Sequence, residues 1–333
     1  MDAINTFLAG ILDGINSIIN SYGWSIVVFT ILIKLVLFPL DLKSRKSMRR
    51  MSSLQPQVAK LQKKYANDKE KLNQKTAELY RKEHISPLSG CLPMLVSLPV
   101  LFAMFAAMRM VANMQLAKQA LDLLTGVQTS EGWLWVRNLW MPDSPFSSMI
   151  VDQNSLKQIP ADIWAKAFAL LNGDQVGILA NLQITAETLT VDNIYNALQA
   201  SQIYVSETAL WGTMPQLNLI VFNLPIYAHN NGFFILPVLA AVTQYLMTLT
   251  QPQTPTASMD AAGNPAASTN KFMKWFFPIF SLYICSSYNA GFSIYWVMAN
   301  LISWGQGLVM NRIFDAQEKQ KKTTEVAGEE SFR

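Results

Sequence analysis

The chain has 333 residues, of which 51% are hydrophobic and only 14% are charged, and its mean hydropathy is +0.19. Such a composition is typical of a protein embedded in lipid and argues against an ordinary soluble protein. The 26 basic residues exceed the 22 acidic residues, for a net charge of +4, and they are unevenly distributed along the chain.

The first predicted element is an amphipathic helix within residues 1–21. Apolar residues recur there at three- and four-residue spacing, namely Ile4, Phe7, Leu8, Ile11, Leu12, Ile15, Ile18 and Ile19. The opposite side carries Asp2, Asn5, Asp13, Asn16 and Asn20. A basic n-region and a small-residue cleavage site are both missing, so we do not expect a cleavable signal peptide. We expect this helix to lie in the outer interface of a membrane, with a short sixth spanning helix as the alternative.

Five apolar stretches are candidate membrane spans, and they are residues 22–40, 88–111, 233–249, 273–287 and 292–313. The fourth stretch has 15 residues, which cover only about 22 Å of a hydrocarbon core of about 30 Å. We therefore leave open whether 273–287 spans the membrane or is a buried or tilted segment.

The distribution of Lys and Arg sets the expected orientation, because basic residues favour the cytoplasmic side. Residues 41–85 carry 13 basic and five acidic residues, whereas residues 114–231 carry four basic and nine acidic residues. We therefore expect 41–85, the linker 251–271 and the tail 314–333 in the cytoplasm. The N-terminus and 114–231 should then lie outside.

The cytoplasmic stretch 41–85 is predicted to form a helical hairpin. Its turn is expected near 66–69, where Asp68 can cap the second helix. Pro56 suits the first turn of a helix, so we predict a break from the membrane helix near 53–55. The hairpin is either a solvated arm or a paddle on anionic headgroups, and we favour an arm with some lipid contact.

The outer stretch 114–231 has a mixed, water-soluble composition and is predicted to be a small helical insertion, with helices at 161–171 and 191–200. Trp133, Trp135 and Trp140 are interpreted as an interfacial segment rather than a cofactor site. The linker 251–271 is rich in Pro, Ala, Ser and Thr, so we expect it to be flexible. The resulting division is 1–21, 22–113, 114–231, 232–313 and 314–333.

A search for catalytic signatures finds no HExxH, GxSxG, GxxxxGK[ST] or CxxC motif, and the chain has only two histidines. We therefore predict neither an enzyme nor a metal or cofactor site. Cys91 and Cys285 are interpreted as small buried hydrophobes.

Lys34 is the residue that most needs an explanation, because it lies inside an otherwise apolar span. A lysine near the centre of a membrane costs about 3 kcal/mol on insertion scales. Snorkelling to the inner surface is the alternative, but Lys43 lies nine residues away, about 13 Å along a helix, which exceeds the comfortable reach of the side chain. We therefore expect Lys34 to face a wet cavity. The spans also carry further polar residues: Thr30, Ser97, Thr243, Gln244, Ser281, Ser286, Ser293, Asn300, Ser303 and Gln306.

At this point the sequence resembles the YidC-type membrane protein insertases, a family that includes the Oxa and Alb proteins of organelles. Residues 23–105 are similar to its first core helix, cytoplasmic hairpin and second helix. Residues 233–246 and 289–306 are similar to its third and fifth helices. The motifs that recur together are LQP in the hairpin, SPLSGCLP before the second helix and AGFSIYW in the fifth.

The resemblance implies an all-α polytopic membrane protein, with the five-transmembrane-helix core of Gram-positive-type members, a cytoplasmic hairpin and an extracellular helical insertion. It also implies a hydrophilic groove that is open to the cytoplasm and to lipid. Lys34 matches the basic groove residue, which is commonly Arg, and Ser97 stands where some members have Gln. The expected groove residues are Lys34, Thr30, Ser97, Gln244, Trp296 and Asn300. The outer stretch after about residue 149 is longer than the resemblance leads us to expect.

The implied function is insertion and folding of nascent membrane proteins, with these proteins and the lipid bilayer as partners. The Sec translocon and the ribosome are further candidate partners, and no specific recognition of nucleic acid is expected. A secondary transporter is an alternative, although it would need paired ionisable residues and repeated halves. A structural scaffold is the other alternative.

Overall fold

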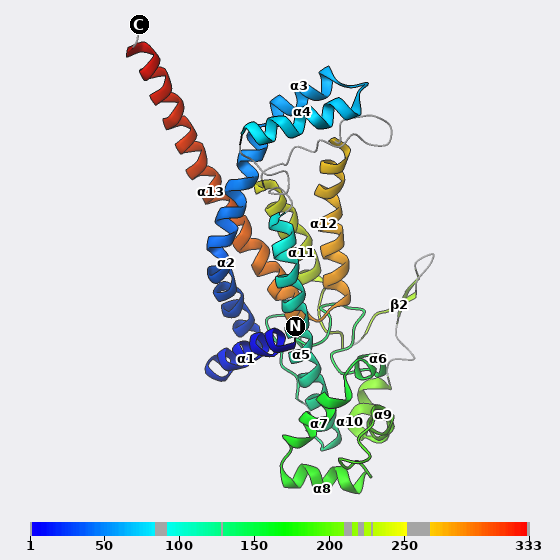
Figure 1. Cartoon of the computed structure of the whole chain (residues 1–333). Helices are drawn as coiled ribbons and strands as arrows, with labels where there is room; N and C mark the ends of the chain where they lie inside the picture. The colour runs from blue at the N-terminus through cyan, green and yellow to red at the C-terminus, as the bar shows by residue number, and fades with distance from the viewer. Residues whose placement is uncertain are drawn as a thin grey trace. The chain divides into compact units, whose positions relative to one another are not determined.

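The computed structural model describes residues 2–83, 92–127, 129–209, 215–218, 223–227, 229–251 and 267–331. Helices dominate these residues (Figure 1), as the sequence predicts. The chain divides into two compact units. The first unit contains Met1–Phe29, Leu101–Ala240 and Ser281–Trp296. The second unit contains Thr30–Val100, Ala241–Phe280 and Val297–Arg333.

In the first unit, helix α1 (Asp2–Ile19) precedes the start of α2 (Tyr22–Ser53). The predicted helix is confirmed, but its polar side is not simply turned to water. Asp13 accepts a hydrogen bond from the Tyr22 hydroxyl at 2.9 Å, and Asn16 accepts one from the Ser25 hydroxyl at 3.3 Å. Of its apolar residues, Leu12 is buried. A second set remains exposed and suits lipid contact, namely Ile4, Phe7 and Ile18.

The outer insertion also belongs to the first unit and is helical, as predicted. Its helices are α6 (Gln153–Lys157), α7 (Ala161–Ala169), α8 (Gly173–Asn181), α9 (Val191–Ala200) and α10 (Gln202–Thr208). Side chains cap their first turns: Asp152 caps α6, Asn172 caps α8 in a capping box with Gln175, and Thr190 caps α9. An antiparallel pair of short strands, β1 (Gln216–Asn218) and β2 (Asn223–Pro225), follows and was not predicted.

A buried polar network holds the end of this insertion at the start of α11 (Ile235–Thr250). The Asp143 carboxylate accepts hydrogen bonds from the backbone N–H groups of Phe233 at 2.9 Å and Leu236 at 2.7 Å, and from the Trp135 indole at 3.0 Å. A carboxylate at this place satisfies orphan N–H groups and favours the helix dipole. Trp140 is 2% exposed, so the interfacial interpretation does not hold for that residue.

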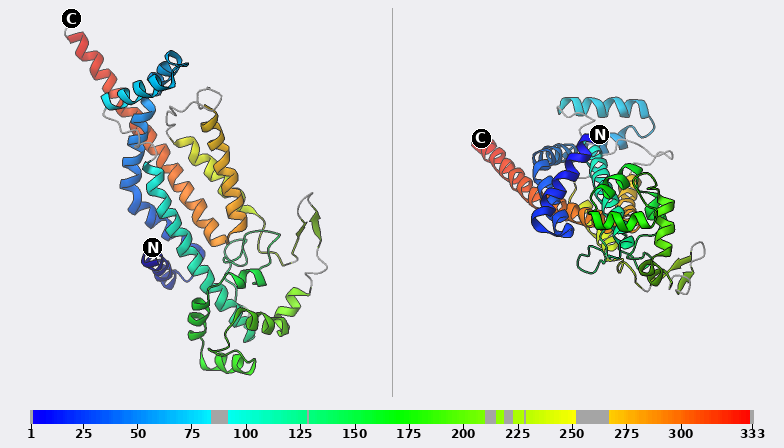
Figure 2. Two further views of the ribbon diagram at one scale, coloured as in Figure 1. Left: turned by 45° about the vertical axis from the view of Figure 1, so that its right-hand side comes forward. Right: turned by 90° about the horizontal axis from the view of Figure 1, so that it is seen from below.

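In the second unit, α2 ends at Ser53, and α3 (Gln55–Lys64) and α4 (Lys69–Lys82) form the predicted hairpin (Figures 1 and 2). Asp68 accepts a hydrogen bond from the Lys71 backbone at 2.9 Å and so caps α4, as expected. Leu54, Val58 and Tyr80 are buried together and join the two helices to the end of α2. Both the break near 53–55 and the turn are confirmed.

The remaining long helices are α5 (Leu92–Leu124), α12 (Ala267–Ser287) and α13 (Ala290–Ser331). Helix α12 has 21 residues and starts six residues earlier than expected, but the added residues 267–272 are mostly polar, so the apolar stretch itself keeps its 15 residues. Among the described residues, Tyr22–Lys64 and Pro99–Leu124 contain stretches that are long and apolar enough to cross a membrane. For the other three stretches, the helices are present and membrane spanning stays a prediction. Most of the predicted flexible linker lies outside the described residues.

Candidate functional site

Lys34 faces α13 within the second unit. Its ammonium donates a hydrogen bond to the Ser303 hydroxyl at 2.8 Å. The next two residues of α2, Leu35 and Val36, are 63% and 76% exposed and present an apolar surface. The charged side chain therefore lies on the inward side of the helix and ends on a polar partner. This contact favours the inward-facing arrangement over snorkelling.

Ser303 also binds a second cation of α2, because its backbone carbonyl accepts a hydrogen bond from Arg45 Nη2 at 2.9 Å. Arg45 is only 8% exposed. The sequence counted Arg45 among the basic residues of 41–85 and did not single it out as a buried residue. A signal was present: Lys34, Asp41 and Arg45 are separated by seven and four residues, so they share one face of a continuous helix.

Three more predicted residues are buried in the second unit: Thr30 on α2, Gln244 on α11 and Asn300 on α13. The Asn300 amide donates a weak, 3.5 Å hydrogen bond to the Thr243 hydroxyl, which links α13 to α11. Polar side chains from α2, α11 and α13 therefore meet in one unit, and hydrogen bonds of this kind help to fix helix positions in lipid.

The structure does not test whether Trp296 and Ser97 belong with that group. Trp296 belongs to the first unit, where its indole donates a hydrogen bond to the Ser281 hydroxyl at 3.1 Å and its ring lies 5.5 Å from that of Phe292. Ser97 is part of α5, but its side chain lies outside the described residues. Groove lining by these two residues, as by the other four, therefore stays a prediction.

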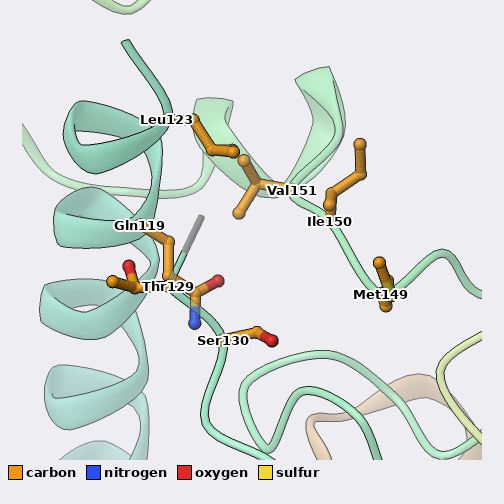
Figure 3. A pocket seen from close by; sticks show the side chains of 7 residues that line it. All are labelled: Gln119, Leu123, Thr129, Ser130, Met149, Ile150 and Val151. Carbon is orange, nitrogen blue, oxygen red and sulfur yellow. The ribbon is translucent and has the colours of Figure 1, made fainter. Parts of the chain in front are cut away.

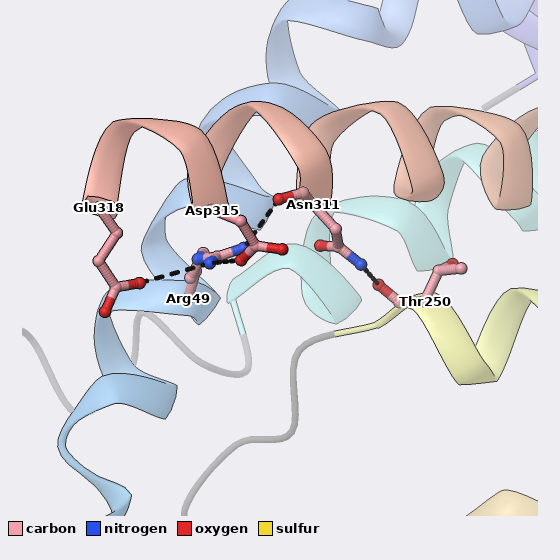
Figure 4. Close-up of polar contacts among 5 residues, drawn as sticks. All are labelled: Arg49, Thr250, Asn311, Asp315 and Glu318. Carbon is pink, nitrogen blue, oxygen red and sulfur yellow. Dashed lines mark hydrogen bonds and ion pairs between the residues drawn. The ribbon is translucent and has the colours of Figure 1, made fainter. Parts of the chain in front are cut away.

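Ion pairs and hydrogen bonds of Arg49 join α2 to α13 beyond Arg45 (Figure 4). The Arg49 guanidinium pairs with Asp315, approaches Glu318 at 3.5 Å and donates to the Asn311 carbonyl at 3.4 Å. The Asn311 amide in turn donates to the Thr250 carbonyl at the end of α11, at 3.1 Å. The same three helices that carry the polar residues are thus tied together along α13.

A cavity is present in the first unit, lined by Gln119, Leu123, Thr129, Ser130, Met149, Ile150 and Val151 (Figure 3). Its volume of about 10 Å³ gives room for at most about one water molecule. It is therefore too small to be a site for an organic ligand, and it includes none of the predicted groove residues.

Comparison with known proteins agrees with the resemblance seen in the sequence. Residues 14–319 match the family model described as 60Kd inner membrane protein. A protein of Chlorobaculum tepidum is 27% identical over 317 residues, which are 95% of this chain and 37% of the relative. A protein of Clostridium perfringens is 36% identical over 147 residues, which are 43% of this chain and 54% of the relative.

Both relatives are named membrane protein insertase YidC, and so is a protein of Fusobacterium nucleatum that is 51% identical over 106 residues, or 32% of this chain and 52% of the relative. The matches thus cover between 37% and 54% of the length of these relatives. The family description and these bacterial relatives indicate a bacterial plasma membrane as the location. With the family model matching residues 14–319, the chain belongs to the 60Kd inner membrane protein family.

Proposed function

We propose that this chain is a membrane protein insertase that helps nascent membrane proteins to insert and fold. The observation that carries the proposal is the inward-facing Lys34, whose ammonium ends on Ser303 of α13 instead of reaching for a membrane surface. An ionisable group at membrane depth is expensive to keep and is usually functional. The relatives are named membrane protein insertases, and insertion is the function that we propose for this ionisable group.

The first step brings a client to the inner side of the membrane. A nascent apolar segment with a short hydrophilic flank meets the basic hairpin α3–α4, and the flank enters a groove among α2, α11 and α13. Acidic residues of the flank are attracted by Lys34. Two unit charges 4 Å apart attract by about 4 kcal/mol at an effective dielectric constant of 20, which offsets part of the desolvation of the carboxylate.

The second step releases the apolar segment into lipid. The polar flank then crosses a thinned remainder of the hydrocarbon core, which is about 30 Å thick in full. Burial of the client's own apolar surface drives the step, and the membrane potential acts on its charges. This mechanism breaks no covalent bond. It uses the expected orientation, in which the N-terminus is outside and the C-terminus is cytoplasmic.

Partners follow from the same scheme. Nascent membrane proteins and the bilayer are the required partners. The Sec translocon and the ribosome are additional partners, for which the basic hairpin offers a contact surface. We assign no specific recognition of nucleic acid. A transporter or a scaffold is the competing proposal, and a scaffold predicts that removing the charge of Lys34 leaves insertion unchanged.

The test is insertion of a short single-spanning client into liposomes that contain the purified chain. The client is made in two forms, with Asp or with Asn in its flank, and the chain is compared with Lys34→Arg, Lys34→Ala and Lys34→Glu. Lys34→Arg should keep activity. Lys34→Ala should lower insertion of the Asp client by about tenfold, which corresponds to about 1.4 kcal/mol, and Lys34→Glu should lower it further. Equal insertion by all four proteins would refute the electrostatic step.

A further inference from the structure

Two cations of α2 converge on one residue of α13, and only one of them was expected. Lys34 Nζ binds the Ser303 hydroxyl at 2.8 Å, and Arg45 Nη2 binds the Ser303 carbonyl at 2.9 Å. Lys34 and Arg45 are 11 residues apart, or about 16 Å along the helix axis, so their long side chains bring the two charges much closer together than their backbones are. The second unit therefore contains a paired cationic feature rather than a single ammonium.

Arg45 is not fully satisfied by this arrangement. Its Nη1 atom is buried and has no hydrogen-bond partner among the residues that the structure describes. A guanidinium has five N–H donors, and a buried donor without a partner is costly. The atom lies beside Gly307 of α13, whose added Cβ would be 3.0 Å away. A buried cation with unused donors at this place is suited to accept an anionic ligand.

Asp41 is the nearest carboxylate along the same face of α2, two turns after Lys34 and one turn before Arg45. Because opposite charges on one helix face attract each other, Asp41 supplies a counter-charge to both cations. Within the described part of the chain, however, no carboxylate forms an ion pair with Lys34 or Arg45, and Asp41 is only partly buried. Asp41 therefore supplies a counter-charge near both cations without forming a direct ion pair with either of them.

We propose that Lys34 and Arg45 together form the receptor for carboxylates in a client's hydrophilic flank, and that Asp41 is a resident counter-ion with which those carboxylates compete. The inference rests on the proposed function and names two further specificity-determining residues. Arg45 lies nearer than Lys34 to the hairpin end of α2. A client carboxylate therefore meets Arg45 first and Lys34 second.

If Asp41 competes with the client, neutralising Asp41 and removing a cation should change insertion of the Asp client in opposite directions. Neutralising Asp41 leaves the two cations without their internal counter-charge, so a client carboxylate should bind more favourably. Neutralising Arg45 removes the first cation that the carboxylate meets. Neither change should matter to a client whose flank is neutral, because attraction to the receptor depends on the client's own charge.

The experiment measures insertion of the Asp and Asn clients by liposomes containing Arg45→Gln, Arg45→Lys or Asp41→Asn. Lys46→Gln is the matched control, since Lys46 is an exposed cation of the same helix. Arg45→Gln should lower insertion of the Asp client at least threefold and leave the Asn client unchanged, and Arg45→Lys should restore most of the loss. Asp41→Asn should raise insertion of the Asp client at subsaturating concentration about twofold or more.

The outcomes separate this inference from the proposed function. If Lys34→Ala impairs the Asp client while Arg45→Gln behaves like Lys46→Gln, the paired receptor is wrong and the insertase proposal stands. If Arg45→Gln impairs both clients equally, its role is structural and the receptor is again wrong. Because Arg45 is buried and its loss can affect folding, Asp41→Asn gives an independent test: an unchanged or lower insertion of the Asp client contradicts the role of Asp41.

Discussion

The Ser303 contacts explain how a charged lysine is tolerated on α2. A neutral hydroxyl gives Lys34 one hydrogen bond but no counter-charge. The ammonium therefore keeps electrostatic capacity for a ligand, which an ion pair with a resident carboxylate would have used. The same reasoning applies to Arg45, whose described partner is the backbone carbonyl of Ser303. Both cations are held in place without a direct ion pair to a carboxylate among the described residues.

A carboxylate in the first unit provides a pH-dependent test of the fold. Glu131 accepts a hydrogen bond from the Tyr22 backbone N–H at the start of α2. Burial raises the pKa of Glu131 above its ordinary value of 4.5, against the opposing effect of that hydrogen bond. Its contribution to stability is therefore fully present below about pH 4.5 and is lost as the pH rises through the higher pKa of the folded state.

Glu131→Gln should remove this part of the pH dependence. The amide oxygen of Gln can still accept the Tyr22 N–H, but it has no charge to desolvate. Thermal unfolding in detergent, followed from pH 4 to pH 8 for both proteins, should show the variant gaining stability relative to the parent as the pH rises. A constant difference across this range would show that burial of Glu131 does not couple to folding.

Residue identities on α2 show what the sequence could and could not predict. Lys34 was identified because a charge inside an apolar run is conspicuous. Arg45 and Asp41 were counted with the polar stretch 41–85, because they follow Leu40, where the apolar run ends. The helix continues to Ser53, as the predicted break near 53–55 implies, and this continuity puts the three residues on one face. Burial of Arg45 depends on α13, whose Ser303 lies 258 residues away in the sequence.

Helices α11 and α13 approach each other closely at Gly307. A Cβ added to Gly307 would lie 2.6 Å from Thr250 Cβ, which is the branched carbon of a short side chain and cannot move aside on its own. The close approach of the two helices therefore requires glycine at this position. Gly305, two residues earlier on the same helix, has no atom within 4 Å of an added Cβ.

Alanine substitutions at Gly305 and Gly307 should change the stability of the protein in opposite directions. Gly305→Ala should stabilise the protein by up to about 1 kcal/mol, because alanine is the better helix former. Gly307→Ala should instead destabilise it, by about 1–3 kcal/mol, because the helices must separate. Unfolding in mixed micelles with increasing denaturing detergent compares the two variants with the parent. Equal effects of both substitutions would contradict the close packing of α11 on α13.

Elements with local sequence signals were predicted best. The hairpin, its Asp68 cap and the break near Pro56 follow from capping and proline rules that act within one turn. The early start of α12 and the strands β1 and β2 were not predicted, since Thr, Ser and Asn at 268–270 read as linker and three-residue strands are too short to show alternation. The inward contacts of Asp13 and Asn16 were also missed, because a polar residue on an amphipathic helix usually faces water.

At the scale of the whole molecule, the long helices contribute residues to two compact units, and each unit assembles segments that are distant in sequence. Periodicity predicts that such helices exist but not which of their faces meet. The resemblance to known insertases gave the expected function class and the expected groove role of Lys34. The proposed cooperation of Lys34 with Arg45 could be inferred only from their shared contacts with Ser303 in the second unit.

The central claim is that Lys34 supplies a positive charge at a place that water and a client can reach. Its most direct test uses the variant Lys34→Cys in a protein in which Cys91 and Cys285 are replaced. The variant is placed in liposomes and treated with membrane-impermeant thiosulfonates, one of which adds a cationic ethyl group and the other an anionic one. We predict that both reagents modify the thiol from the hairpin side, and that only the cationic adduct restores insertion of the Asp client. A thiol that neither reagent can modify from either side of the membrane, or equal rescue by both adducts, would contradict the account.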